Sequence, residues 1–140
     1  MQRTILITGA SRGIGRGIAE RLLREGHRLS LGLRKPDQLV GTVLDHPDVL
    51  RVRYDASDPS AADAFVEKTE EIWGGFDSLI HCAGCLHRTP LLFDDDAEPE
   101  LEELWRINLM GPWRLTRAAW RLLKQSGQGR IQVLVSMSGK

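Results

Sequence analysis

Residues that could bind a phosphate are concentrated near the N-terminus of the chain. The stretch Thr8-Gly9-Ala10-Ser11-Arg12-Gly13-Ile14-Gly15 follows a short apolar run and opens a segment with apolar residues at helical spacing. Glycine permits positive φ and a close approach of backbone to a ligand, and a helix amino end offers free N–H groups. The pattern predicts a pyrophosphate-binding turn. Its spacing, G-x-x-x-G-x-G, differs from the common dinucleotide fingerprint G-x-G-x-x-G.

Strand-length apolar runs alternate with amphipathic stretches along the whole chain. We expect strands at 4–8, 29–33, 49–54, 77–82 and 131–136, and helices at 13–25, 36–44, 59–73 and 99–125. This order predicts one α/β domain over residues 1–140, a Rossmann-like, doubly wound parallel sheet of five strands in the order 3-2-1-4-5. At the first strand–helix junction of such a chain, the glycines favour a nucleotide site over a tight turn that binds nothing.

The composition excludes several other classes of function. Lys+Arg and Asp+Glu each number 19, so the formal net charge is zero, and a nucleic-acid binder that works by bulk positive charge is not expected. The apolar runs are far shorter than the roughly 20 residues that cross a bilayer, so we expect no membrane segment. The N-terminus lacks a signal-peptide apolar region, and two cysteines make no disulfide framework, which together predict a cytoplasmic chain.

Four motifs, in this order, resemble the N-terminal part of the short-chain dehydrogenase/reductase family. The stretch Thr8-Gly9-x-x-x-Gly13-x-Gly15 matches the family's glycine turn, and His81-Cys82-Ala83-Gly84 stands at its N-N-A-G turn after the fourth strand. Asn108 matches the family's helix asparagine, and residues 129–136 match its fifth strand. His81 and Cys82 depart from the family's two asparagines, whereas Ala83 and Gly84 keep the backbone that should face the cofactor.

The resemblance implies an oxidoreductase that moves hydride between a nicotinamide cofactor and a small carbonyl or alcohol substrate. It assigns Ser136, with Ser138 as the rival, to the substrate oxygen, and Asn108 to a proton relay. The substrate pocket would have one wall at 86–93. The family's general acid is a tyrosine with a lysine four residues on, beyond the serine. The one tyrosine here is Tyr54, which no lysine follows at that position.

We therefore expect an incomplete chain, truncated before strands six and seven and catalytically inactive alone. Its fifth strand would be an exposed apolar edge that could pair with another chain. Three explanations stay open. The chain is a truncated product of a full reductase, a cofactor-binding half-domain or sensor without catalysis, or one of two chains, the second of which supplies the tyrosine and lysine.

Positive charge around the expected ribose site favours NADP(H) over NAD(H). An NAD site would place an acid at the end of the second strand, where this chain has Arg34 and Lys35. Arg12 is the second candidate for the 2′-phosphate, because guanidinium groups bind phosphate bidentately; solvated surface arginines are the alternative. The other expected cofactor contacts are Gly9, Ser11, Gly13, Ile14, Gly15, Asp55, Ala56, Cys82, Ala83 and Gly84. Asp55 and Ala56 follow the third strand, where the resemblance implies a contact with the adenine.

Two further patterns have competing interpretations. Cys82 and Cys85, with His81 and His87, offer redox or zinc spacing, but adjacent strand residues point to opposite faces and zinc ligands come in separated pairs, so we expect free thiols and no metal. The helix at 100–125 is apolar on two faces and must bury both. One should lie on the sheet. The other, with the tryptophans, Leu109, Met110 and Leu123, resembles the family's subunit contact and indicates a homo-oligomer, unless it packs within the chain.

Overall fold

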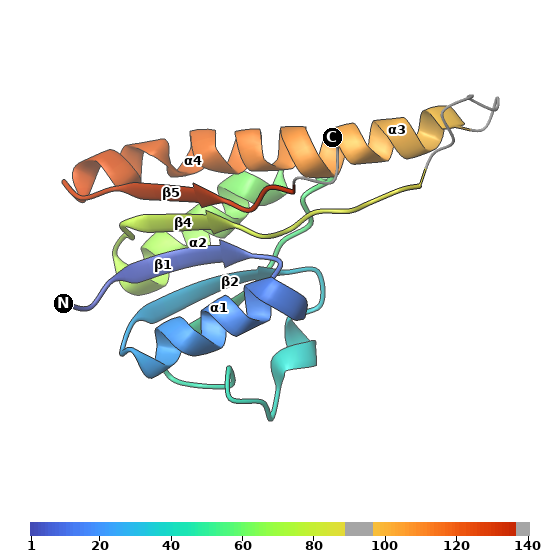
Figure 1. Ribbon diagram of the computed structural model, residues 1–140. Helices are drawn as coiled ribbons and strands as arrows, with labels where there is room; N and C mark the ends of the chain where they lie inside the picture. The colour runs from blue at the N-terminus through green and yellow to red at the C-terminus, as the bar shows by residue number, and fades with distance from the viewer. Residues whose placement is uncertain (89–96, 137–140) are drawn as a thin grey trace.

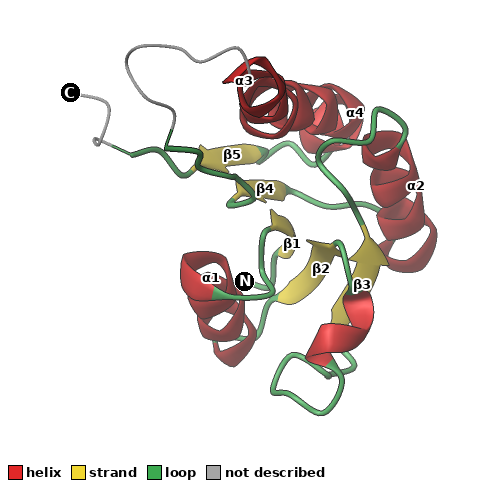
Figure 2. Ribbon diagram, turned by 90° about the vertical axis from the view of Figure 1, so that its right-hand side faces the viewer, coloured by secondary structure: helices red, strands yellow, loops and turns green. Residues whose placement is uncertain are grey.

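The computed structural model describes residues 1–88 and 97–136. Its five parallel strands form one sheet in the order β3-β2-β1-β4-β5, which confirms the predicted topology (Figure 1 and Figure 2). The strands are β1 (Thr4–Thr8), β2 (Arg28–Leu33), β3 (Val49–Arg53), β4 (Ser78–His81) and β5 (Arg130–Val133). The helices are α1 (Gly13–Arg24), the 3-10 helix η1 (Pro36–Leu39), α2 (Ala61–Trp73), α3 (Ala97–Trp105), the π-helical segment η2 (Arg106–Met110) and α4 (Gly111–Gln125).

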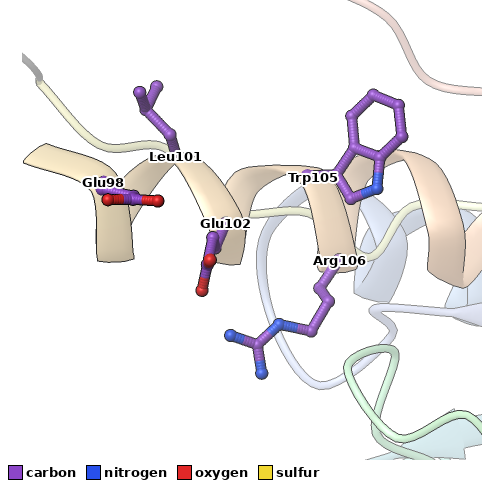
Figure 3. Close-up of a pocket in the computed structure, with 5 residues that line it drawn as sticks. All are labelled: Glu98, Leu101, Glu102, Trp105 and Arg106. Atoms are coloured by element: carbon purple, nitrogen blue, oxygen red, sulfur yellow. The ribbon is translucent and has the colours of Figure 1, made fainter.

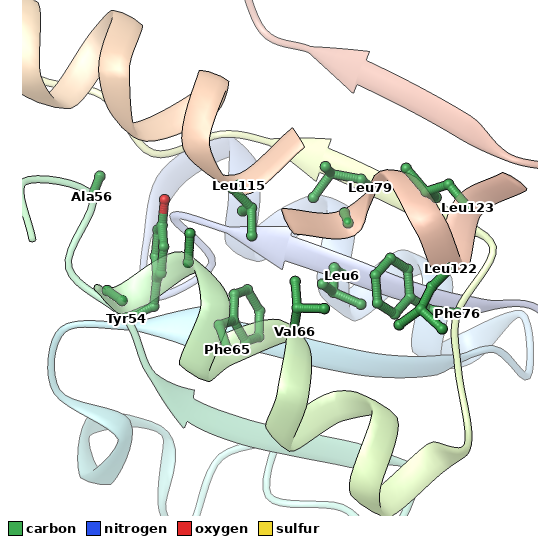
Figure 4. Packing of buried hydrophobic residues seen from close by; sticks show 13 residues of the cluster. Leu6, Tyr54, Ala56, Phe65, Val66, Phe76, Leu79, Leu115, Leu122 and Leu123 are labelled. Carbon is green, nitrogen blue, oxygen red and sulfur yellow. The ribbon is translucent and has the colours of Figure 1, made fainter. Parts of the chain in front are cut away.

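Alternate residues of the strands enter two separate apolar cores. Ile5 and Ile7 belong to the core under α1 and η1, and Leu6 between them belongs to the core under α2 and α4. Helix α1 therefore lies on one face of the sheet and α2 and α4 on the other (Figure 2). In the second core, Phe65 of α2 and Leu115 of α4 are fully buried beside Leu6 (Figure 4). Both faces of β1 are covered, which is why this strand is a continuous apolar run.

Helix α2 begins at Ala61 and not at Pro59, where the sequence predicted it. The carboxylate of Asp58 accepts hydrogen bonds from the amide and the hydroxyl of Ser60, at 2.9 and 2.8 Å. Asp58 thus closes a turn in front of the helix instead of capping its first residues. Helix η1 is likewise shorter than the predicted 36–44, because the chain turns at Gly41 with φ at +75°.

The predicted helix at 99–125 starts at Ala97 and consists of α3, η2 and α4. Its buried side on α4 comprises Leu115, Ala119, Leu122 and Leu123. Leu123 was predicted on the tryptophan side, and its place in the core is a correction. Four large residues on α3, η2 and α4 are 47–60% exposed, and we call them the tryptophan face: Trp105, Leu109, Trp113 and Trp120.

Strand β5 forms an edge of the sheet, and all four of its residues are exposed. Ile131 and Val133 are 40% and 55% exposed. The predicted exposed apolar edge is therefore confirmed. Over 1–88 and 97–136, the helices are all too short or too polar to cross a membrane.

Candidate cofactor and active site

The loops that leave the carboxyl ends of β1, β2 and β4 meet at one edge of the sheet. Strand β1 pairs with β2 on one side and β4 on the other, so Thr8 lies level with both Gly32 and His81. The chain order reverses between β1 and β4, and ligands of open α/β sheets bind at such a switch point. The loop that begins with Gly9 and the loop that begins with Cys82 therefore both start at this switch point.

The glycine turn packs directly on the loop after β4. Gly9 has φ of +69°, and a Cβ built on it would lie 2.6 Å from the Ala83 nitrogen. A Cβ on Gly15 would overlap the Gly9 carbonyl and approach the Cys82 Cβ to 3.1 Å. At these two positions, glycine is required by close approach. Gly13, with φ of +59°, has no atom within 4 Å of its notional Cβ. Its side of the turn is open, as a bound pyrophosphate would need.

Thr8 joins the two loops through its side chain. Its hydroxyl oxygen accepts hydrogen bonds from the amides of Cys82 and Ala83, both at 3.2 Å. Sequence reasoning placed Thr8 in the glycine motif but not among the site residues. The contact could not be found from the sequence, because it depends on the pairing of β1 with β4.

His81 and Cys82 point to opposite faces of the sheet, as predicted. The Nε2 of His81 lies 2.9 Å from the Thr116 hydroxyl on α4, while Cys82 packs against the core under α1. His81 is 3% exposed, and its burial lowers its pKa to about 4, so the imidazole is neutral at pH 7. Burial raises the pKa of the Cys82 thiol. The pKa of the Cys85 thiol is raised by burial and then by the charge of Glu103. Protonated thiols are poor nucleophiles and poor metal ligands.

Asn108 holds the loop after Gly84 from the π-helical segment η2. Its side-chain carbonyl accepts from the Cys85 amide at 2.9 Å, and its side-chain nitrogen donates to the Cys85 carbonyl at 2.8 Å. A Cβ on Gly84 would lie 3.2 Å from the Asn108 oxygen. The side chain therefore fixes the backbone beside Ala83 and Gly84. Any contribution of this residue to a proton relay would add to that positioning role.

The predicted phosphate ligands are exposed. Arg12 precedes α1 in an extended conformation, and its side chain makes no capping hydrogen bond to that helix. Ser11 beside it is partly buried, and Ile14 is 68% exposed. Arg34 is exposed directly after β2. Arg12 therefore follows β1 and Arg34 follows β2, two neighbouring strands of the sheet.

Asp55 and Ala56 form the loop after β3. The Ser57 hydroxyl and amide donate to the Asp55 carboxylate at 2.7 and 2.9 Å, and these bonds lower the pKa of that carboxyl group. The charges of Arg34 and Arg53 lower the pKa of Asp55 further. Arg53 was not predicted as a site residue. Its signal was its place at the end of β3, level with Leu33 in the neighbouring strand.

Ser136 lies three residues beyond the end of β5, past the carboxyl edge of the sheet. The Leu134 amide donates to the His81 carbonyl at 3.0 Å, so the chain continues beside the β4 loop for at least one residue past the strand. The rival serine, Ser138, lies outside the described residues. So does most of the predicted pocket wall at 86–93, of which the structure describes 86–88.

A hollow of about 440 Å³ lies on α3 and is lined by Glu98, Leu101, Glu102, Trp105 and Arg106 (Figure 3). None of the predicted cofactor residues lines it, so it is separate from the glycine turn. Among residues 1–88 and 97–136, no three His, Cys, Asp or Glu side chains are placed to hold a metal ion.

Comparison with known proteins agrees with this architecture. The family model described as short chain dehydrogenase matches residues 3–140. An agropine synthesis reductase of Rhizobium rhizogenes is 38% identical over 97% of this chain and 32% of its own length. The 3-oxoacyl-[acyl-carrier-protein] reductase MabA of Mycobacterium avium is 32% identical, over 99% of this chain and 51% of its own. The chain thus spans a third to about half of these two relatives.

Solved structures give the same result. A short-chain dehydrogenase from Streptomyces avermitilis has a TM-score of 0.86 and 30% identity, over 99% of this chain and 51% of that one. An alcohol dehydrogenase from Thermococcus sibiricus, complexed with 5-hydroxy-NADP, has a TM-score of 0.82 and 28% identity, over 99% of this chain and 63% of that one. On the family match, the relatives and the shared sheet order, the chain belongs to the short chain dehydrogenase family.

Proposed function

We propose that this chain forms the NADP(H)-binding part of an oxidoreductase that interconverts a carbonyl and an alcohol. The observation that carries the proposal is the packing of Gly9 against Ala83, since it places the glycine turn and the β4 loop on the two sides of the switch point. The two relatives described above are named as reductases. A bound nicotinamide would supply or accept the hydride.

The choice of NADP(H) rests on charge. Arg12 and Arg34 are exposed in the loops after β1 and β2. The loop after β2 offers a second cation, Lys35, in place of the acid that would bind the ribose 2′-hydroxyl of NAD(H). The Thermococcus sibiricus alcohol dehydrogenase, solved in complex with 5-hydroxy-NADP, supports the same choice.

In the proposed reaction, the chain's own residues bind and orient. Ser136 would donate a hydrogen bond to the substrate oxygen. Asn108 would hold the backbone of the β4 loop in position to contact the cofactor. Tyr54 does not serve as the proton donor. It is 4% exposed in the core under α2, and burial raises its pKa to about 12. We therefore propose that these 140 residues alone bind the cofactor without turnover.

We also propose that the tryptophan face contacts a second copy of the chain. Trp113 is 53% exposed, with the Arg117 guanidinium 5.1 Å from its ring centre. Exposed tryptophan and arginine on one helix are typical of the centres of protein interfaces. A cytoplasmic location is the last part of the proposal, and the two free thiols support it.

The test is a fluorescence titration with NADPH and NADH, followed by an assay of carbonyl reduction. We expect saturable binding of NADPH, weaker binding of NADH, and no measurable turnover by this chain. Equal affinity for both cofactors would contradict the choice of NADP(H), and binding of neither would contradict the proposal as a whole. Turnover that Ser136→Ala abolishes would show that proton transfer does not need a tyrosine.

A further inference from the structure

The start of α4 contacts a second loop of the cofactor site as well as the β4 loop. Asn108, in η2, binds the Cys85 backbone. Three residues on, Gly111 lies against Ala56 of the β3 loop. One helix junction therefore touches two loops that carry predicted cofactor contacts, the β3 loop and the β4 loop. π-Helical turns inside helices occur frequently at functional sites.

Gly111 is in an ordinary helical conformation, with φ of −59° and ψ of −58°. Its amide donates to the Arg106 carbonyl, which closes the π turn. The backbone angles suit any residue, so conformation does not explain the glycine. Space does explain it, because a Cβ on Gly111 would lie 2.8 Å from the Ala56 carbonyl oxygen and 2.9 Å from the Ala56 Cβ. Neither atom belongs to a side chain that could rotate away.

The β3 loop is built so that a displacement at Ala56 would be passed to its neighbours. Ala56 is 8% exposed. On either side of it, the Tyr54 amide donates to the Leu33 carbonyl at 2.8 Å, and the Asp58 amide donates to the Asp55 carbonyl at 3.0 Å. The Ser57 amide is bound to the Asp55 carboxylate. These bonds join Asp55 to Ser57 and Asp58 across Ala56, so we expect a displacement of Ala56 to shift Asp55 as well.

We infer that Gly111 is a positioning residue for the adenine side of the cofactor site. The absence of a side chain lets the β3 loop rest on α4, and this contact sets the position of Asp55 and Ala56 relative to the glycine turn. The inference rests on the proposed function and on the expectation that these two residues contact the adenine. It goes beyond that function because it assigns to Gly111 the role of holding Asp55 and Ala56 in position.

The test compares Gly111→Ala with Gly17→Ala. Gly17 is also helical, and a Cβ there would meet nothing within 4 Å, so this control adds a methyl group without a contact. Adenosine 2′,5′-bisphosphate is the probe for the adenine half and nicotinamide mononucleotide for the other half, each titrated by NMR. In Gly111→Ala, we expect the affinity for the adenine probe to fall about fivefold to tenfold, because a shift of about 0.5–1 Å forfeits a quarter to a half of the dispersion attraction at each contact. Binding of the mononucleotide should not change, and Gly17→Ala should bind both probes as the parent does.

Adding Ala56→Gly removes the 2.9 Å contact and should restore part of the affinity for the adenine probe. This double variant is the test protein if Gly111→Ala does not fold, and its affinity should then lie between that of the parent and a tenfold loss. Equal losses for the two probes, or unchanged affinity for both, would overturn the role of Gly111. If the parent protein binds NADPH but not the adenine probe, the inference fails and the proposed function stands. If the parent binds neither, the proposed function fails and the inference falls with it.

Discussion

Thr8 and Ala83 are joined by a 3.2 Å hydrogen bond between a buried hydroxyl and a backbone amide, and the same hydroxyl also accepts from Cys82. Thr8→Val keeps the shape of the side chain and leaves both amides without this acceptor. We expect a loss of about 1–3 kcal/mol in the free energy of unfolding, towards the lower end of this range because the two donor amides are only partly buried. Thr8→Ser keeps the oxygen and should lose much less. Urea unfolding of the three proteins gives the comparison; equal stability of Thr8→Val and the parent would mean that the two bonds contribute nothing.

Burial of neutral His81 predicts a loss of stability in acid. Its pKa is about 4 in the folded protein against 6.5 in the unfolded chain, so the folded state binds fewer protons between these values. The stabilisation is fully present above pH 6.5 and falls as the pH drops towards 4, by about 3 kcal/mol in all at 1.36 kcal/mol per pKa unit.

The measurement for His81 is the free energy of unfolding at pH 7.5 and at pH 4.5. His81→Asn should show a smaller decrease between these pH values than the parent. His46→Asn is the control, because the His46 side chain is 45% exposed, and it should keep the parent's pH dependence. The same dependence in all three proteins would exclude His81 as its source.

Arg34→Asp should exchange the cofactor preference. Loss of one charge-assisted phosphate contact costs about 1.5–3 kcal/mol, which lowers the affinity for NADPH by one to two decades. The new carboxylate can accept from the ribose hydroxyls, so NADH should bind more tightly. Arg24→Asp makes the same change of charge at the last residue of α1, far along the helix from the glycine turn, and should leave the ratio of the two affinities unchanged. An equal effect of the two variants would attribute the preference to net charge.

Trp113→Glu should disrupt self-association. A tryptophan at the centre of an interface contributes at least about 2 kcal/mol, equivalent to a roughly thirtyfold weaker association. Sedimentation velocity over a range of concentrations measures the shift towards monomer. Ile72→Glu is the matched control, since Ile72 is 48% exposed on α2, a helix that carries none of the four residues of the tryptophan face. A parent protein that is monomeric at all concentrations would contradict the interface.

Asp77 anchors the amino ends of β1 and β4. Its carboxylate accepts from the Arg3 guanidinium at 2.8 Å, from the Thr4 amide at 3.1 Å and from the Ser78 hydroxyl at 2.6 Å. Asp77→Ala leaves a largely buried guanidinium without its carboxylate partner and should cost about 3–5 kcal/mol. Arg3→Met combined with Asp77→Leu removes both charges and should recover part of this loss in thermal unfolding. A double variant as unstable as Asp77→Ala would place the cost in the Thr4 and Ser78 bonds.

The sheet order could be predicted because each strand carries a local signal. Both faces of β1 are covered by helices, so its apolar run is continuous, and the glycines mark where the run ends. The start of α2 was misplaced because aspartate and serine are both residue types whose side chains can bind nearby amides, and sequence alone does not decide between Asp58 and Ser60 as the residue before the helix.

The candidate site was only partly predictable for a different reason. The glycine turn is contiguous in sequence, and its glycines by themselves indicate a tight turn with positive φ. The bonds of Asn108 to Cys85 and the contact of Gly111 with Ala56 join segments far apart in the chain. Asparagine and glycine are common in helices and turns for other reasons, so the residue types of Asn108 and Gly111 did not indicate Cys85 and Ala56 as their partners.

The π-helical segment gives the two halves of the long helix independent orientations. Each residue of an α-helix turns the chain by about 100°, so deletion of one residue within 106–110 would rotate α3 by that angle relative to α4. The packing of α4 on α2 would remain, whereas Trp105 and the hollow beside it would face a new direction. The direction in which α3 points around the helix axis is thus set by the number of residues in η2, a segment whose Ile107 also packs against the core under α2 and α4.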